Sequence, residues 1–131
     1  MTILLFSYRM SLIERVIAAL APDLYSFVLS TNVAETLSTL DQGHLSAVLV
    51  DMDHPESKEL LMLLALRPAD YGVAVLMLLR PRSSNVNLSF PGHNLRHYQY
   101  VDPLFNPKEL VLILFRAISG IKNQRRSDSS L

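Results

Sequence analysis

The sequence contains no cysteine, which excludes disulfide bonds and thiolate metal sites. It also lacks an excess of either charge, because 12 lysine and arginine residues balance 12 aspartate and glutamate residues. A chain without net charge has no overall electrostatic attraction for nucleic acid or for an acidic membrane surface. We therefore expect no direct contact with nucleic acid.

Long apolar runs are absent as well. The longest uncharged apolar run covers residues 71–79, whereas a membrane-spanning helix needs roughly 20 apolar residues. The apolar N-terminus has no basic flank of the kind that precedes the core of a signal peptide. These features predict a cytoplasmic protein with no membrane segment.

What the chain does have is enough apolar material for one core, since half of its 131 residues are hydrophobic. Short apolar runs alternate with stretches whose apolar residues recur at helical spacing. The runs are apolar on both sides, as buried parallel strands are. The alternation predicts strands at 2–7, 24–29, 47–50, 73–79 and 97–101, and helices at 11–21, 32–43, 57–67 and 106–120.

Local signals support the first two predicted helices. Ser11 with Glu14, and Asn32 with Glu35, have the spacing of capping boxes, in which side chains bond the free N–H groups of a helix start. Gly43 is well placed to end the second helix, because glycine tolerates the left-handed conformation.

The last predicted helix has the clearest boundaries. Asn106 fits the capping position and Pro107 the first helical position, while Gly120 is expected to end the helix. We therefore expect one domain over 1–121, followed by a polar tail or the start of a linker over 122–131. The predicted buried stripe of this helix comprises Leu110, Val111, Leu114, Phe115 and Ile118.

Strands that alternate with helices predict an α/β fold, a doubly wound five-stranded parallel sheet with strand order 2-1-3-4-5. Residues 80–96 hold two prolines and a glycine and show no helical period, so the fourth helix is expected to be degenerate. The predicted order brings the ends of strands one and three together. Ser7, Tyr8, Asp51 and Asp53 should then surround one crevice.

Two segments resemble a known family. Residues 43–51 (GHLSAVLVD) place Asp51 at the end of the third predicted strand, and Pro55 follows four residues later. Residues 105–110 (FNPKEL) look like the family's entry into its last helix. In both segments the chain resembles response-regulator receiver domains. The resemblance implies a flavodoxin-like, receiver-like fold in which Asp51 is the equivalent of the phospho-accepting aspartate.

The other active-site groups of that family are missing. Receivers have an acidic pair after the first strand that binds Mg²⁺, where this chain has residues 7–9 (SYR). They have Ser or Thr where this chain has 78–79 (LL), and a lysine where 101–104 (VDPL) contains none. Arg9 would, if anything, oppose a metal ion. The departures imply an inactive Asp51, no Mg²⁺ or other cofactor, and no catalytic residue.

We interpret the chain as a non-catalytic pseudo-receiver of a bacterial signalling or transcription regulator, in a two-component system, and not as an enzyme. It would act by protein–protein interaction or dimerisation, and an output domain could be appended to it. Receivers usually make such contacts through helix four, strand five and helix five, so a protein partner or a homodimer is expected there. The candidate partner or anion surface comprises Arg80, Arg82, Arg96, Tyr98 and Tyr100.

Two other interpretations stay open. Asp51 could serve an atypical receiver that is still phosphorylated, with Asp53 replacing one missing carboxylate. The loop at 80–97 carries three arginines and no acidic residue, so it could bind a small anionic ligand such as a nucleotide. His54, beside the two aspartates, is expected to be a solvated loop residue.

Overall fold

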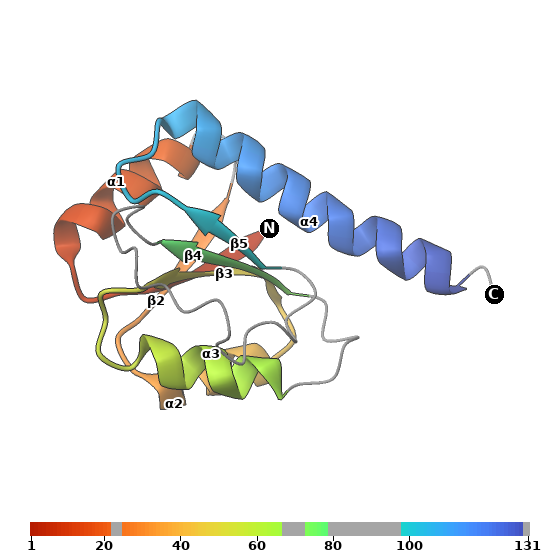
Figure 1. Ribbon diagram of the computed structural model, residues 1–131, viewed down its shortest axis with the longest axis horizontal. Helices are drawn as coiled ribbons and strands as arrows, with labels where there is room; N and C mark the ends of the chain where they lie inside the picture. Colours follow the sequence, from red (N-terminus) through yellow and green to blue (C-terminus); the bar gives the residue numbers. More distant parts are fainter. Residues whose placement is uncertain (22–24, 67–72, 79–97, 130–131) are drawn as a thin grey trace.

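The structure, a computed structural model, describes residues 1–21, 25–66, 73–78 and 98–129 (Figure 1). Its strands are β1 (Thr2–Phe6), β2 (Ser26–Ser30), β3 (Leu45–Asp51), β4 (Ala74–Leu78) and β5 (Tyr98–Val101). Its helices are α1 (Met10–Leu20), α2 (Val33–Asp41), α3 (Ser57–Ala65) and α4 (Pro107–Ser129).

The five strands form one parallel sheet in the order β2-β1-β3-β4-β5, which confirms the predicted doubly wound arrangement. Helices α1 and α4 cover one face of this sheet, and α2 and α3 cover the other (Figure 1). Two apolar cores result, one on each face.

Strand β1 illustrates why the chain builds two cores. Successive side chains of a strand point to opposite faces. Ile3 and Leu5 therefore join the core under α1 and α4, whereas Leu4 and Phe6 join the core under α2 and α3. All four are at most 2% exposed, and each such burial contributes about 1.5–3 kcal/mol. The interior position of β1, between β2 and β3, follows from this two-sided apolar pattern.

The start of α2 confirms the predicted cap. Asn32 Oδ1 accepts the backbone N–H of Glu35 at 2.8 Å, and Asn32 Nδ2 donates to Glu35 Oε2 at 3.1 Å. After α2, Gly43 adopts a φ of 78°, the left-handed conformation that glycine reaches without steric cost. The chain then enters β3, which carries Asp51 at its far end.

The predicted capping box at the start of α1 is wrong. The capping position is Arg9, whose side chain makes no capping hydrogen bond, and Ser11 lies inside the helix. The backbone carbonyl of Arg9 accepts the N–H of Ile13 at 3.0 Å, while the Arg9 N–H donates to Ser7 Oγ at 3.1 Å. This arrangement leaves the Arg9 side chain available to groups beyond the helix.

Two predictions for α4 are wrong. The helix continues through Gly120 to Ser129, because glycine within a helix costs only about 1 kcal/mol and does not break the hydrogen-bond pattern. Phe115 is 58% exposed and does not belong to the buried stripe. Asn106 does cap the helix, since its Oδ1 accepts the N–H of Lys108 at 3.0 Å. The domain boundary at residue 121 stays a prediction.

Residues 79–97 lie outside the described part of the chain, and with them the prediction of a degenerate fourth helix. In the described ranges, no helix combines the length and the apolar character needed to cross a membrane.

Candidate functional site

The carboxyl ends of β1 and β3 meet at the point where the strand order reverses, which is where α/β sheets of this kind place their sites. Phe6 pairs with Val50 in the register of the two strands, so the next residues, Ser7 and Asp51, are neighbours. Asp51 is fully buried, and Ser7 Oγ donates a hydrogen bond to its Oδ2 at 2.7 Å.

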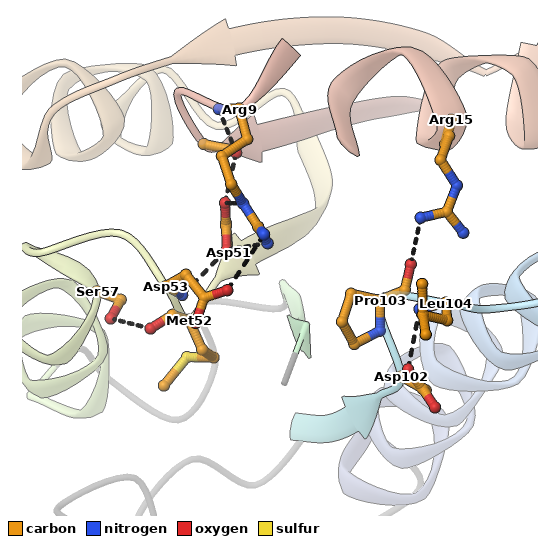
Figure 2. A network of polar contacts seen from close by, with 10 residues as sticks. Arg9, Arg15, Asp51, Met52, Asp53, Ser57, Asp102, Pro103 and Leu104 are labelled. Atoms are coloured by element: carbon orange, nitrogen blue, oxygen red, sulfur yellow. Dashed lines mark hydrogen bonds and ion pairs between the residues drawn. The ribbon is translucent and has the colours of Figure 1, made fainter. Parts of the chain in front are cut away.

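Arg9 reaches the same carboxylate from the start of α1 (Figure 2). Its Nε donates to Asp51 Oδ2 and its Nη2 donates to Asp51 Oδ1, both at 2.8 Å. The remaining nitrogen, Nη1, lies 3.2 Å from Asp53 Oδ2. A planar guanidinium fork suits such two-point binding of a carboxylate, which a lysine cannot reproduce. We refer to Arg9, Asp51 and Asp53 as the Arg9 clamp.

The hydrogen bonds to Asp51 use its whole accepting capacity. An ionised carboxylate has about four lone-pair sites. Oδ2 accepts from Ser7 and Arg9, and Oδ1 accepts from Arg9 and from the backbone N–H of Asp53 at 3.0 Å. No lone pair of the Asp51 carboxylate is left for a further partner while the clamp is closed.

The same contacts set the charge state of the clamp. Burial by itself raises the pKa of Asp51, but hydrogen bonds from Arg9, Ser7 and the Asp53 N–H, together with the Arg9 charge, outweigh it. The pKa of Asp51 therefore lies below its ordinary value. Hydrogen bonding to Asp51 in turn raises the pKa of Arg9. Both partners keep their charges at neutral pH.

Receiver-like sites raise the question of Mg²⁺, which takes oxygen ligands in near-octahedral geometry. In the part of the chain that the structure describes, no three histidine or carboxylate side chains are grouped so that they could hold a metal ion. The two nearest carboxylates, Asp51 and Asp53, already share Arg9. The guanidinium supplies the positive charge that a cation would bring, so this set of groups does not suit Mg²⁺.

His54 is only 6% exposed, so the prediction of a solvated loop histidine is wrong. Its Nε2 lies 2.8 Å from the carbonyl oxygen of Thr31, and because a carbonyl only accepts, Nε2 carries the hydrogen. Its Nδ1 accepts the backbone N–H of Glu56 at 3.0 Å, and its ring packs on Phe6 with centroids 4.3 Å apart. His54 therefore links the loops after β2 and β3.

The loop after β5, where receivers carry a lysine, is held from α1 (Figure 2). Arg15 Nη1 donates to the carbonyl oxygen of Pro103 at 2.7 Å. The same guanidinium lies over the ring of Phe105, 4.9 Å from its centroid, which is cation–π geometry. Asp102 Oδ1 accepts the N–H of Leu104 at 2.9 Å within the loop. We refer to the bonds of Arg15 with Pro103 and Phe105 as the Arg15 contact.

The structure brings Ser7, Asp51 and Asp53 together as the sequence predicts, whereas the Tyr8 ring is 54% exposed and meets His54 edge-on. Arg9 is the residue that sequence reasoning missed, because it was considered only as an obstacle to a metal. The sequence contained the signal: a basic residue follows β1 closely, and two carboxylates two residues apart, Asp51 and Asp53, stand at the end of β3 and just after it.

The candidate partner or anion surface falls largely beyond the described residues, because Arg80, Arg82 and Arg96 all lie within 79–97. Tyr98 begins β5. Tyr100 is half-buried and packs against the core under α2 and α3. This surface stays a prediction.

No protein-family model and no curated protein sequence matches this chain. Solved structures do. NtrX from Brucella abortus, in a complex with ADP, matches with a TM-score of 0.79 at 16% identity, over 98% of this chain and 28% of NtrX. A CheY-like response-regulator receiver domain protein from Methanospirillum hungatei JF-1 matches with a TM-score of 0.75 at 13% identity, over 93% and 97% of the two chains.

The receiver domain of TorR, the response regulator of the TMAO respiratory system, gives a TM-score of 0.75 at 16% identity, over 92% of this chain and 98% of that domain. At such identities the likeness establishes the fold, which is that of response-regulator receiver domains. The chain thus spans 28% of NtrX but nearly the whole of isolated receiver domains.

Proposed function

We propose that this chain, which has the fold of response-regulator receiver domains, is a pseudo-receiver. In this proposal it acts in a bacterial signalling or transcription regulator through contact with a protein partner or a second copy. It uses neither aspartate phosphorylation nor Mg²⁺. The observation that carries the proposal is the Arg9 clamp, in which one arginine binds both oxygens of the buried Asp51.

Phosphorylation of an aspartate needs a carboxylate oxygen that is free to attack phosphorus, and positive charge to neutralise the transferred group. In the clamp every accepting site of Asp51 is used, so attack requires Arg9 to leave first. Separating a buried, two-point ion pair costs about 3 kcal/mol or more. That cost alone slows the reaction by a factor of about 100.

The loop after β5 supports the same proposal. A transferred phosphoryl group would need a second cation on the other side of Asp51. In place of the family's lysine, residues 102–104 present a carboxylate and a backbone carbonyl, and both are already bonded. The cation that contacts this loop from α1, Arg15, is bound to Pro103 and Phe105.

The test is a calorimetric titration of the chain with Mg²⁺ and then beryllofluoride, together with intact-mass analysis after incubation with acetyl phosphate. Wild type is expected to bind neither ligand and to remain unmodified. If wild type binds both, and Asp51→Asn abolishes this binding, the proposal is wrong and Asp51 is a working phospho-acceptor.

A gain-of-function variant tests the stated cause. Arg9→Asp removes the clamp and places a third carboxylate beside Asp51 and Asp53, so it is expected to bind Mg²⁺ measurably. Ser11→Asp, inside α1, is the matched control that adds a carboxylate while the clamp stays in place. Failure of Arg9→Asp to bind Mg²⁺ would mean that the clamp is not what excludes the metal.

A further inference from the structure

Strand β2 lies at a border of the sheet and pairs with β1 alone among the described strands. Two hydrogen bonds show which of its residues face β1. The N–H of Ser26 donates to the carbonyl oxygen of Met1 at 2.9 Å, and the carbonyl oxygen of Ser30 accepts the N–H of Ser7 at 3.2 Å. Backbone groups of successive strand residues point to alternate sides, so Val28, midway between these two, also faces β1.

Phe27 and Leu29 therefore direct their N–H and C=O groups away from the sheet. In the part of the chain that the structure describes, no hydrogen bond joins these outward groups to a partner. Backbone polar groups are normally paired within a protein or with water, so this side of β2 is open to another strand. The side chain of Leu29 is 49% exposed, which adds an apolar contact to the open side.

The border strand also lacks the features that usually protect such a strand from pairing. Natural proteins use charged side chains, proline or a bulge for this purpose. Residues 26–30 (SFVLS) contain no charged residue and no proline, and their register with β1 is unbroken from end to end. Nothing within β2 itself therefore opposes the addition of a strand along its outer side.

We infer that β2 pairs with the β2 strand of a second copy of this chain, antiparallel and about a two-fold axis at Val28. The inference rests on the proposed function, because it names the second copy as the partner. The sequence SFVLS reads almost the same in both directions, as a two-fold contact requires. Pairing about Val28 places Phe27 opposite Leu29 of the second copy, and Ser26 opposite its Ser30.

This register agrees with the directions of the backbone groups. Opposite residues of an antiparallel pair alternate between those that exchange two hydrogen bonds and those that exchange none. Phe27 and Leu29 of the second copy would exchange two, and the symmetric pair would exchange two more. Val28 would face its own copy without a bond, because its backbone groups face β1. A shift by one residue would set outward groups opposite groups that already face β1.

The side chains favour a second copy over an unrelated strand. Phe27 and Leu29 lie on the same face of β2, and Phe27 packs against the core under α1 and α4. In the proposed dimer each exposed Leu29 would lie directly across from a Phe27 ring. Aromatic and aliphatic side chains opposite each other stabilise a sheet. The same contact occurs twice, because the axis repeats it.

The first test is analytical ultracentrifugation of the chain up to about 1 mM, the range that detects weak association. Wild type is expected to form a dimer. Leu29→Lys places a charge on the border strand and should weaken the dimer about tenfold or more. The matched control is Met62→Lys on α3, because Met62 is 47% exposed and lies outside β2, so the dimer should not change. A monomer throughout, polymers beyond the dimer, or equal weakening by Met62→Lys overturns the inference.

A proline tests whether the backbone makes the contact. Leu29→Pro removes an N–H that points outward and not toward β1, so the sheet should remain while the dimer is lost. Circular dichroism checks that the variant is folded. If it does not fold, amide hydrogen exchange of wild type decides instead. Raising the concentration should slow exchange at Phe27 and Leu29, and equal rates at low and high concentration contradict the pairing.

Cross-linking tests the register, and the absence of natural cysteine makes single-cysteine variants specific probes. Val28→Cys would face its own copy with about 4.5 Å between Cα atoms, within the range of a disulfide, so it should cross-link. Ser26→Cys is the control, because the two copies of this position would lie about 13 Å apart along the strands. Efficient cross-linking through Ser26→Cys, with none through Val28→Cys, overturns the proposed register.

These measurements need neither Mg²⁺ nor a phosphoryl donor, so they are separate from the test of the proposed function. A monomer that fails to bind beryllofluoride defeats the dimer alone. A dimer through β2 that also binds beryllofluoride defeats the pseudo-receiver proposal and leaves the β2 contact standing.

Discussion

Two arginines hold the carboxyl-end loops of the sheet, and they do so by different means. Arg9 binds a fully buried carboxylate at two points and neutralises a charge that has no water around it. Arg15 binds a neutral backbone carbonyl and an aromatic ring, and it forms no ion pair with the described residues. The first contact helps to occupy every accepting site of the Asp51 carboxylate, whereas the second holds the shape of a loop.

The difference teaches that a buried carboxylate and a neutral backbone carbonyl are held by different kinds of contact. At the end of β3 the Asp51 carboxylate is buried. A buried charge is costly unless it is paired, and Arg9 is its partner. At the β5 end, none of the described residues buries a charge beside the loop, which is held by a hydrogen bond and ring packing. Four measurements can break or sharpen this contrast.

The largest effect should come from removing the cation of the clamp. Arg9→Ala leaves the Asp51 carboxylate buried and unpaired, which should lower the free energy of unfolding by about 3 kcal/mol. Urea denaturation followed by circular dichroism measures it. Arg9→Lys keeps the charge but loses the two-point hydrogen bonding, so it should lower the free energy of unfolding by less than Arg9→Ala does.

A double variant shows whether the clamp is there for stability. Arg9→Met/Asp51→Leu replaces the ion pair with apolar side chains of similar size and should stay near wild-type stability. If Arg9→Ala unfolds the chain no more easily than wild type, Asp51 has another partner, and the contrast with Arg15 disappears.

Acid should act on the clamp and not on the Arg15 contact. The pKa of Asp51 is lower in the folded chain than its ordinary value of 3.8, so the unfolded chain binds more protons as the pH falls. The stability that the clamp contributes is complete above the ordinary value and is lost as the pH drops through the folded pKa. Unfolding free energies measured between about pH 6 and pH 3 should therefore fall for wild type.

Two variants separate this effect from general acid denaturation. The side chain of Asp51→Asn cannot titrate, so the free energy of unfolding of this variant should fall less steeply with decreasing pH than that of wild type. Arg15→Ala should keep the wild-type slope, because the Arg15 contact contains no acidic group. Equal slopes for wild type and Asp51→Asn would contradict the assignment of a lowered pKa to Asp51.

Loss of the Arg15 contact should have a moderate and local effect. Arg15→Ala removes one hydrogen bond and a cation–π contact and should cost about 1–2 kcal/mol. Hydrogen exchange should speed up in the loop 102–106 while β3 is unchanged. Arg15→Lys serves as the control, since it retains the charge near the Phe105 ring. Faster exchange at Asp51 and Asp53 would show that the two arginine contacts are coupled.

The sequence predicts the backbone of this molecule better than its site. Two-sided apolar strands such as β1 and β3 have one stable place in a parallel sheet, and the strand order follows from them. Asn32 and Gly43 signal their roles locally, through side-chain and backbone chemistry within a few residues. Such features depend on residues only a few positions apart, so the sequence of a short stretch is enough to predict them.

The clamp and the buried His54 depend on contacts between distant segments. Arg9 meets Asp51 across 42 residues, and His54 meets Thr31 across 23. A pattern of residue types shows neither which side chain turns inward nor which cation pairs with a buried carboxylate. The prediction that Phe115 is buried was wrong for a related reason. Helical spacing alone does not show how wide a stripe of the helix the sheet can cover.

The smallest effect should come from removing the contact between Asp53 and Arg9, the exposed part of the clamp. Asp53 is 55% exposed, and its contact with Arg9 Nη1 is 3.2 Å long, so solvent screens it. Asp53→Asn should cost at most about 0.5 kcal/mol, and about 1 M salt should abolish the difference from wild type. Arg9→Ala should keep most of its cost in the same salt, because Asp51 is buried. Urea denaturation of wild type, Asp53→Asn and Arg9→Ala at two salt concentrations tests which contacts hold the clamp. It separates a clamp held by the Arg9–Asp51 pair alone from one that also needs the Arg9–Asp53 pair. A loss for Asp53→Asn as large as that for Arg9→Ala would show that Asp53 is what keeps Arg9 turned inward.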